Sequence, residues 1–226
     1  MDAEQSLHGV SLPEPASLPR WLPAALGRRF GTTEGTALSD RVGARYAGLL
    51  VLPSPFADPR ERAFANTEIL PLLALYLTLL ADGLTAEAAE TEVRRLRAQA
   101  LRERPVPGVW LTAHAPGRQH WRRWLVRREV AAAFPLPTFR LVTTRDEADT
   151  LEFEVRRCPY GAALAAYGAP ELLATFCRLD EVRFDALVSA VTCEHHQAGD
   201  GGACRFCFRL YPDNAALEEA RTYLEM

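Results

Sequence analysis

The sequence contains no lysine, and each of its 26 basic residues is an arginine. A lysine amine is needed to form a Schiff base with a carbonyl substrate or with pyridoxal phosphate, and a lysine contacts the phosphates in a P-loop. Large classes of aldolase, transaminase, kinase and ATPase are therefore excluded on chemical grounds.

A large excess of charge of either sign is also missing. The 26 arginines face 29 acidic residues, so that the formal net charge is −3. Nucleic acids and anionic membranes bind proteins with a clear positive excess, and we expect neither as the main partner. The arginines of residues 118–128 leave nucleic-acid binding as a minor alternative, which a salt-dependent gel shift would reveal. With 48% hydrophobic residues in 226 positions, the chain can bury the core of one domain, or of one domain with an appended arm.

The chain has five cysteines and no long apolar run. An odd number of cysteines without a signal peptide predicts reduced thiols, and the start of the chain lacks the basic and apolar regions of such a peptide. The longest apolar run, Ile69–Ala81, is interrupted by Pro71 and is shorter than the roughly 20 residues of a membrane span. We expect a soluble, cytoplasmic protein with no membrane partner. The cysteines all lie in the last third of the chain: Cys158, Cys177, Cys193, Cys204 and Cys207.

The first part of the chain is rich in proline. Residues 1–60 carry seven prolines and show no sustained helical or strand period, which predicts a partly irregular arm. The apolar piece 46–52 is the part of this arm that could dock as a short segment. We accordingly divide the chain into the arm, residues 1–60, and a single α+β domain, residues 61–226.

Two helices are predicted early in that domain. Residues 70–82 are apolar all round, which is typical of a helix inside the core, with Pro71 in its first turn and Gly83 at its exit. Thr85 is a candidate N-cap for a helix over residues 86–103, which the following prolines end. The narrow apolar stripe of this helix consists of Ala89, Val93, Leu96 and Ala100.

A third helix is predicted over residues 117–134, where Pro135 ends it. We expect its apolar side chains Trp121, Trp124 and Leu125 to face inward. The other faces of this helix then carry five arginines: Arg118, Arg122, Arg123, Arg127 and Arg128.

The pattern changes to alternating apolar and polar residues after this helix. The order of helices followed by β-β-α-α-β-β-α predicts an α+β fold, in which a helical N-terminal half packs on a four-stranded antiparallel sheet. The elements of this second half are predicted as strands over 138–144 and 151–158, helices over 159–167 and 170–186, strands over 187–196 and 203–211, and a helix over 214–224.

The last predicted hairpin brings a thiol and an imidazole together. Burying the apolar face of its second strand favours a register with His195 opposite Cys204 and Cys193 opposite Phe206, which is the layout of a Cys–His nucleophile. A slip by one residue would instead bring Glu194 or His196 beside Cys204. Alternatively, both cysteines are small core hydrophobes.

Cys204 and Cys207 also match the pattern C-x-x-C, which suggests zinc or redox chemistry. In an extended strand, however, these two side chains point to opposite faces, and a thioredoxin-like motif opens a helix rather than a strand. We therefore expect no metal site.

Cys177 and Asp180 are spaced i, i+3 and so lie on one face of a predicted helix. Asp180 borders the core, and desolvation should raise its pKa unless a donor satisfies it. It is a candidate general base, or a group that holds a substrate ammonium or amidine, with a capping or arginine-paired structural acid as the alternative.

Cys158, directly before Pro159 and Tyr160, ends a strand at the start of a helix. A helix N-terminus can lower the pKa of a thiol at such a junction, although plain packing explains the cysteine equally well.

Three of these segments together resemble the L-2-amino-thiazoline-4-carboxylic acid hydrolase family: residues 153–160, residues 176–180 and the Gly-containing turn that leads to Cys204-Arg205-Phe206. A weaker likeness lies in Pro71 with Tyr76 and in residues 84–89. The resemblance extends over roughly residues 60–211. The chain departs from the family pattern at Arg205, where an acidic residue is expected.

The resemblance implies a cofactor-independent, hydrolase-like or cyclase-like enzyme of specialised metabolism that adds water to a small cyclic amidine, a related C=N group or an acyl group. A small-molecule substrate is then the partner, and a homodimer is left open. The competing interpretation is a non-catalytic small-molecule-binding domain of the vinyl-reductase sensor type. In the enzyme, Cys204 and Asp180 should face a shared hollow. The candidate catalytic residues are Cys204, Asp180, Cys177 and His195, and the candidate substrate-binding residues are Cys158, Tyr160 and Glu194.

Overall fold

A computed structural model describes residues 17–109, 118–185, 187, 191–196 and 203–211, and it confirms the mixed α+β class. The helical elements are α1 (Trp21–Phe30), α2 (Thr32–Leu50), α3 (Pro59–Phe64), the π-helical turn η1 (Ala65–Ile69), α4 (Leu70–Ala81), α5 (Ala86–Glu103), α7 (Arg118–Ala133), α8 (Pro159–Ala166), the 3-10 turn η2 (Pro170–Leu172) and α9 (Leu173–Asp185). The strands are β1 (Arg140–Asp146), β2 (Thr150–Arg157), β3 (Val191–His196) and β4 (Cys204–Leu210). The predicted helix over 214–224 lies outside the described residues.

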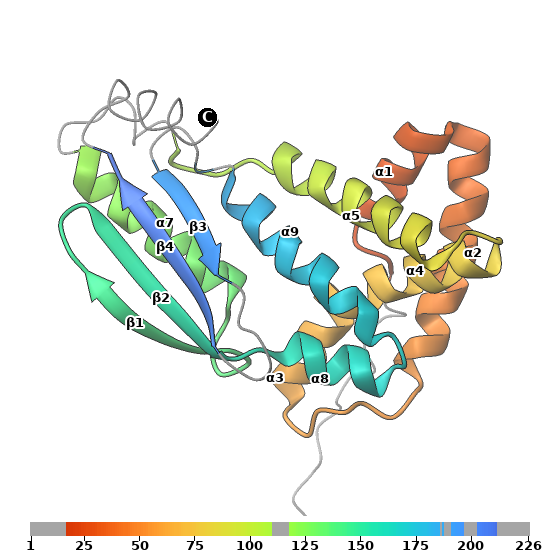
Figure 1. Cartoon of the computed structure of the whole chain (residues 1–226). Coiled ribbons are helices and arrows are strands. Elements are labelled where there is room, and N and C mark those ends of the chain that lie inside the picture. The colour runs from red at the N-terminus through yellow and green to blue at the C-terminus, as the bar shows by residue number, and fades with distance from the viewer. Residues whose placement is uncertain (1–16, 110–117, 186, 188–190, 197–202, 212–226) are drawn as a thin grey trace, which may run out of the picture.

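The strands form one antiparallel sheet in the order β1-β2-β4-β3. Figure 1 shows this sheet at one side of the molecule, with α7 lying across it and with α1, α2, α4 and α5 gathered on the other side. Helix α9 runs between β3 and α5 and so connects the two parts (Figure 1).

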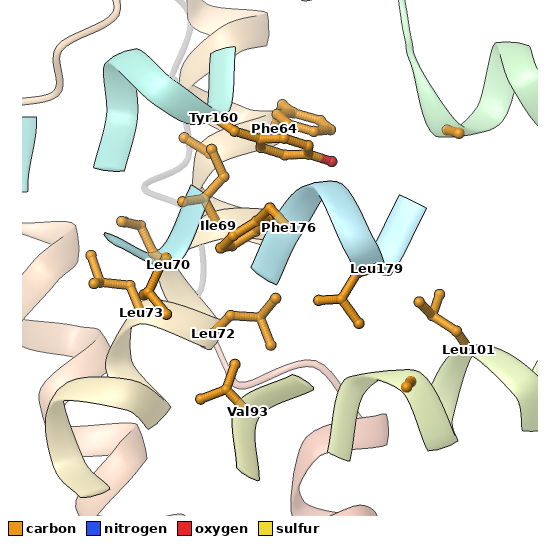
Figure 2. Close-up of a cluster of buried hydrophobic side chains, with 14 of the residues drawn as sticks. Phe64, Ile69, Leu70, Leu72, Leu73, Val93, Leu101, Tyr160, Phe176 and Leu179 are labelled. Carbon is orange, nitrogen blue, oxygen red and sulfur yellow. The ribbon is translucent and has the colours of Figure 1, made fainter. Parts of the chain in front are cut away.

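The two ends of α9 pack in different parts of one continuous core. Near its end, Phe184 contacts Phe206 and Phe208 of β4, with ring centroids 5.7 and 5.0 Å apart. Near its start, Phe176 lies 4.9 Å from the ring of Tyr160, and Figure 2 shows these rings beside Phe64 and above the leucines of α4. Alternation explains the buried face of β4, because its phenylalanines are buried and its arginines are exposed.

Helix α4 confirms the predicted core helix. Its side chains are buried on all sides, Pro71 lies in its first turn, and Gly83 follows it at a φ of +95°, where a residue with a Cβ would be strained. By length and composition alone, Pro59–Ala81 is also able to cross a membrane. However, 67% of that apolar window is buried inside the structure, and the core helix of a soluble protein passes the same test.

The prediction of an irregular arm is wrong for residues 21–50, which form α1 and α2. Of the early prolines, Pro23 falls in the first turn of α1, where a proline is tolerated, and Pro53 comes after α2. The two helices cross closely, because a Cβ at Gly35 would lie 2.7 Å from the Cα of Gly27. Their buried residues recur at helical spacing and join the common core: Leu22, Leu26, Leu38, Val42, Tyr46 and Leu49.

The prediction for α7 is wrong in which side chains it buries. Leu125 is buried, but Trp124 is 40% exposed and stacks against Arg128, whose guanidinium carbon lies 4.8 Å from the ring centroid. Arg122, predicted on an outer face, is fully buried. The buried stripe follows helical spacing, as expected, but it includes charged residues: Arg122, Leu125, Val126, Glu129, Val130 and Ala133.

Candidate active site

A pocket of about 680 Å³ opens among α1, η1, α5, α7 and α9. Its volume is in the range of small-molecule sites. Its lining includes four arginines and three glutamates: Arg28, Arg97, Arg104, Arg183, Glu68, Glu103 and Glu129.

A much smaller cavity of about 20 Å³ lies next to this pocket. It has room for about one water molecule. Tyr160 of α8 and Asp180 of α9 line it, together with the apolar side chains Leu72, Leu101, Phe176 and Leu179. The charged lining residues, Glu68, Arg97 and Arg183, also line the large pocket, as does Leu101, so these four side chains form the wall between the two spaces.

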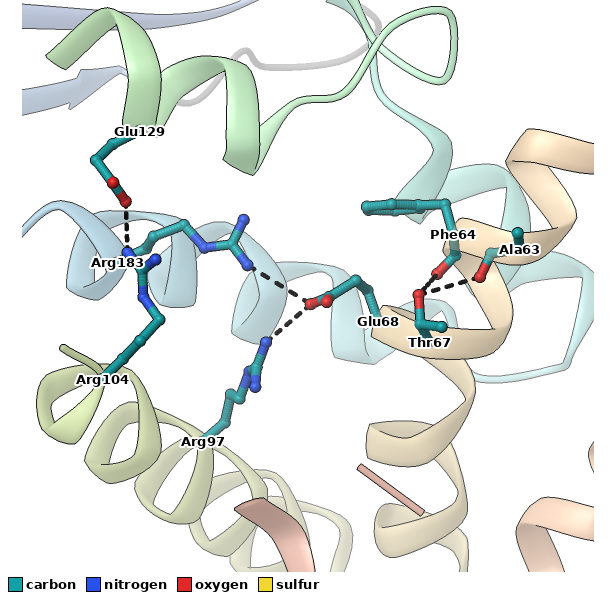
Figure 3. Close-up of polar contacts among 8 residues, drawn as sticks. All are labelled: Ala63, Phe64, Thr67, Glu68, Arg97, Arg104, Glu129 and Arg183. Carbon is teal, nitrogen blue, oxygen red and sulfur yellow. Dashed lines mark hydrogen bonds and ion pairs between the residues drawn. The ribbon is translucent and has the colours of Figure 1, made fainter. Parts of the chain in front are cut away.

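Glu68 is the centre of this wall. Arg97 Nη2 donates to Glu68 Oε2 at 2.8 Å, and Arg183 Nη2 lies 3.5 Å from the same oxygen, as Figure 3 shows. These arginines come from α5 and α9, so one carboxylate joins three elements that are distant in the sequence.

The π-helical turn η1 presents Glu68, and polar groups stabilise this turn. Thr67 Oγ1 donates to the carbonyl oxygens of Ala63 at 3.0 Å and Phe64 at 3.3 Å (Figure 3). The Tyr46 hydroxyl donates to the carbonyl oxygen of Asn66 at 2.9 Å. A π-helical insertion disturbs the regular i→i−4 bonding and is frequent at functional sites. The hydroxyl groups of Thr67 and Tyr46 therefore bind carbonyl oxygens of α3 and of η1.

Asp180 is a buried carboxyl whose pKa is raised to about 7. Burial is the main cause, because it removes the water that stabilises the ionised form. The positive charges of Arg183 and Arg97 act in the opposite direction, whereas the carboxylates of Glu68 and Glu181 raise this pKa further. The predicted desolvation of Asp180 is therefore seen, and the two arginines next to it form ion pairs with Glu68.

Two of the candidate thiols are held in the neutral form. Burial raises the pKa of Cys158 and that of Cys177 to about 12. The backbone N–H of Tyr160 does bond to Cys158 and lowers its pKa, as expected of a helix N-terminus, but burial outweighs this effect. Of the two interpretations of this junction, a lowered thiol pKa and plain packing, the raised pKa of Cys158 therefore favours packing.

Cys204 begins β4, where it pairs with Val155 of β2 and packs partly buried against the core. Its sulfur is close enough to Cys158 and Cys177 to raise the pKa of both thiols. Among the described residues, Tyr160 lines the cavity of Asp180, and Cys204 does not. A hollow shared by Cys204 and Asp180 therefore stays a prediction.

The predicted register of the last hairpin is wrong by two residues. His195 pairs with Phe206 instead of Cys204, and Cys193 pairs with Phe208. The one-residue slip does not occur either, because Glu194 pairs with Cys207. The two-residue shift keeps every residue on its predicted face, so the apolar pattern could not distinguish the two registers. His195 therefore occupies a register position diagonal to Cys204 on the same face of the sheet.

The arginines and the glutamate of the wall were not identified from the sequence. Arg97 lies four residues after Val93 and four before Leu101, at a position of the buried stripe of α5, and Arg183 lies three residues after Asp180 on α9. Charged residues at such buried helical positions were the available signal. Glu68 had no such signal, because the π-helical turn that presents it has no clear sequence pattern.

One comparison with known proteins found a family. The profile of the L-2-amino-thiazoline-4-carboxylic acid hydrolases matches residues 74–208, more than half of the chain. The chain belongs to this family. The resemblance found in the sequence is thereby confirmed, and the name of the thiazoline carboxylate hydrolases denotes hydrolysis of a thiazoline carboxylate. Comparisons with curated proteins and with solved structures gave no match.

In this thiazoline carboxylate hydrolase family member, the matched part of the chain includes α5, α8, α9 and most of β4. It therefore contains Arg97, Tyr160, Asp180 and Arg183. It begins within α4, after Glu68. Among the described residues, no group of three or more His, Cys, Asp or Glu side chains is arranged to hold a metal ion.

Proposed function

We propose that this chain hydrolyses a C=N group in a small cyclic amidine of the thiazoline-carboxylate kind, and that Asp180 is its general acid–base residue. The observation that carries the proposal is the Asp180 carboxyl, buried beside a pocket of small-molecule size, with a pKa of about 7. A proton-transfer group works best when its pKa lies near the operating pH, and strongly perturbed pKa values cluster at functional sites.

The proposed step begins with water in the cavity of Asp180. The water oxygen bonds to the amidine carbon while the π pair of the C=N bond moves to nitrogen. Ionised Asp180 accepts the proton of the water and returns it to that nitrogen. The same nitrogen, which belongs to the ring, then takes up the hydroxyl proton of the adduct. Its bond to the amidine carbon breaks and a carbonyl forms. Asp180 ends in its starting state, and no oxidant or reductant is needed.

Tyr160 supplies a neutral hydroxyl in the same cavity. Burial raises its pKa well above the ordinary value of 10, so that the phenol keeps its proton at neutral pH. Its ring is fixed by contacts with Phe64, Phe139 and Phe176. A rigid O–H group near Asp180 is suited to orient water or substrate.

Cys204 is proposed as the nucleophile of a covalent alternative. Cys158 and Cys177, with pKa values of about 12, hold almost no thiolate at neutral pH, and thiolate is the reactive form. Cys204 lies beside them and is partly exposed. In this alternative, His195 or Glu194 of β3 would move the proton, and Cys158 and Cys177 would line the site.

The test is an assay of L-2-amino-thiazoline-4-carboxylate hydrolysis by the full chain and by two variants. We expect turnover by the wild type, its near loss in Asp180→Asn and its retention in Cys204→Ala. Loss in Cys204→Ala with retention in Asp180→Asn would assign the chemistry to the thiol instead. Binding without turnover in the wild type would favour the small-molecule-binding domain. We also propose a cytoplasmic, specialised-metabolism role without a cofactor.

A further inference from the structure

Glu68, Arg97 and Arg183, together with the apolar Leu101, separate the large pocket from the cavity that contains Asp180. A ligand in the pocket therefore meets these side chains before it can reach Asp180. No other charged residues line both spaces among those that the structure describes.

Two guanidinium groups share the single carboxylate of Glu68. The bond from Arg97 is short, 2.8 Å, whereas the contact from Arg183 is long, 3.5 Å. Burial lowers the pKa of Arg97, Glu68 raises it, and the charge of Arg183 lowers it again. An additional anion would stabilise both cations, particularly when the neighbouring Asp180 is protonated.

The other arginines of the pocket are paired differently. Arg104 donates to Glu129 at 2.6 Å, and Arg128 donates to the same carboxylate at 2.7 Å. Burial alone would raise the pKa of Glu129, but these two hydrogen bonds lower it below the ordinary value. Arg28 pairs with Glu103 at the exposed rim. Arg97 and Arg183 are thus the pocket arginines nearest to the proposed reaction centre.

Arg97 does not depend on Glu68 alone for its position. Its guanidinium carbon lies 4.7 Å from the ring centroid of Trp21, in a cation–π contact, and its side chain is only 13% exposed. A carboxylate that replaced Glu68 would therefore find this guanidinium already ordered. An ordered guanidinium binds a carboxylate with little loss of conformational entropy and offers two parallel N–H donors.

We propose that Arg97 and Arg183 form a carboxylate-binding site, and that Glu68 is an internal carboxylate which the carboxylate of the substrate displaces. This inference rests on the proposed function, because it concerns the same pocket. Displacement of Glu68 removes one of the side chains between pocket and cavity. The substrate carboxylate then lies on the two arginines, and the thiazoline ring lies toward Asp180.

The wild-type chain allows a test with two aromatic probes that lack the reactive thiazoline. We would measure the binding of 2-aminothiazole-4-carboxylate and of 2-aminothiazole by calorimetry at low salt, where ion pairs are least screened. We expect the carboxylate to bind at least about tenfold more tightly, because charge-assisted hydrogen bonds contribute on that scale. Equal affinities would overturn the proposal.

Two variants separate binding by the arginines from competition by Glu68. In Arg183→Gln, the preference for the carboxylate probe should largely disappear while the affinity for 2-aminothiazole stays unchanged. In Glu68→Gln, the carboxylate probe should bind about tenfold more tightly than in the wild type, because its internal competitor has lost its charge. The matched control is Glu103→Gln, which removes an exposed carboxylate of the same pocket and should change neither affinity.

The results distinguish this inference from the proposed function. Weaker or unchanged carboxylate binding in folded Glu68→Gln would contradict displacement. If Glu68→Gln does not fold, the wild-type and Arg183→Gln measurements still decide whether the arginine site exists. A carboxylate preference without thiazoline turnover would support the site and refute the hydrolase. Turnover by the wild type without any carboxylate preference would refute the site and leave the hydrolase standing.

Discussion

The Asp180 carboxyl and the Tyr160 side chain, which come from α9 and α8, line the same small buried cavity. Both groups have raised pKa values, mainly because burial removes them from water. The tyrosine stays protonated at neutral pH, whereas Asp180, with a pKa of about 7, is divided between its two forms. A hydroxyl that keeps its proton and a carboxyl that can accept or donate one thus lie together beside the charged pocket.

Replacing Asp180 with Asn should lower kcat for the thiazoline substrate by roughly 10²- to 10⁴-fold, the usual contribution of a general acid–base group. Asn keeps the shape of the side chain but neither accepts nor releases a proton at neutral pH. Steady-state kinetics with a check of folding by circular dichroism provide the measurement. Asp82→Asn, at the exposed end of α4, is the matched control and should keep full activity. Unchanged kcat in Asp180→Asn would remove Asp180 from the mechanism.

The same substitution should stabilise the protein at high pH. The folded state holds the Asp180 proton up to about pH 7, whereas the ordinary pKa of the unfolded chain is 3.8. The folded state therefore binds more protons between these values, so that the free energy of unfolding of the wild type falls as the pH rises from about 4 to 7. Arg97, Arg183, Glu68, Glu181 and the neighbouring thiols and Tyr160 surround this carboxyl in both proteins, so a difference between wild type and variant isolates its contribution.

Urea denaturation of both proteins across this range is the measurement. The free energy of unfolding of Asp180→Asn should equal that of the wild type near pH 4 and exceed it by a few kcal/mol above pH 7. A difference that does not change with pH would show that Asp180 ionises normally in the folded state.

Alkylation of the native protein at pH 8 should leave Cys158 and Cys177 unmodified. Their pKa values of about 12, raised chiefly by burial, keep the reactive thiolate to a very small fraction. Peptide mass mapping after brief treatment with iodoacetamide gives the labelled positions, and the same treatment in denaturant shows that the peptides are detectable. Rapid labelling of either residue in the native protein would contradict the structure.

Tyr46→Phe should lower the free energy of unfolding by about 1 kcal/mol, because the hydroxyl that donates to the Asn66 carbonyl of the π-helical turn is lost. The buried ring remains and its packing is kept. Urea denaturation should show a lower midpoint with an unchanged slope, since the surface exposed on unfolding is the same. An unchanged midpoint would mean that this hydrogen bond does not stabilise the turn.

The sequence was sufficient to predict the elements whose pattern is local. Each of these patterns depends on neighbouring residues only. The apolar run around Pro71 predicted α4, the Thr85 cap predicted the start of α5, and the alternation of Phe206 and Phe208 predicted β4. Helices α1 and α2 were missed because the flanking prolines obscured their amphipathic spacing. Burial in α7 was mispredicted because its buried stripe contains Arg122 and Glu129, which a hydrophobicity rule assigns to the surface.

The site was predictable only in part. Asp180 could be identified as a buried acid from its place on one helix face, because the apolar neighbours on that face are encoded locally. The charged side chains of the wall, Glu68, Arg97 and Arg183, come from three elements, and nothing in the sequence shows that they meet. The partner of Cys204 was misplaced because a two-residue change of register preserves the apolar face.

The ionisation of Asp180 is the central claim and can be measured directly. In protein carrying ¹³C at the aspartate carboxyl carbons, an NMR titration follows each carboxyl, and the signal missing in Asp180→Asn identifies Asp180. The structure predicts that this signal titrates with a pKa close to 7. A pKa near 4 would contradict the account, because a carboxylate that is fully ionised at neutral pH cannot serve as the buried proton carrier proposed here.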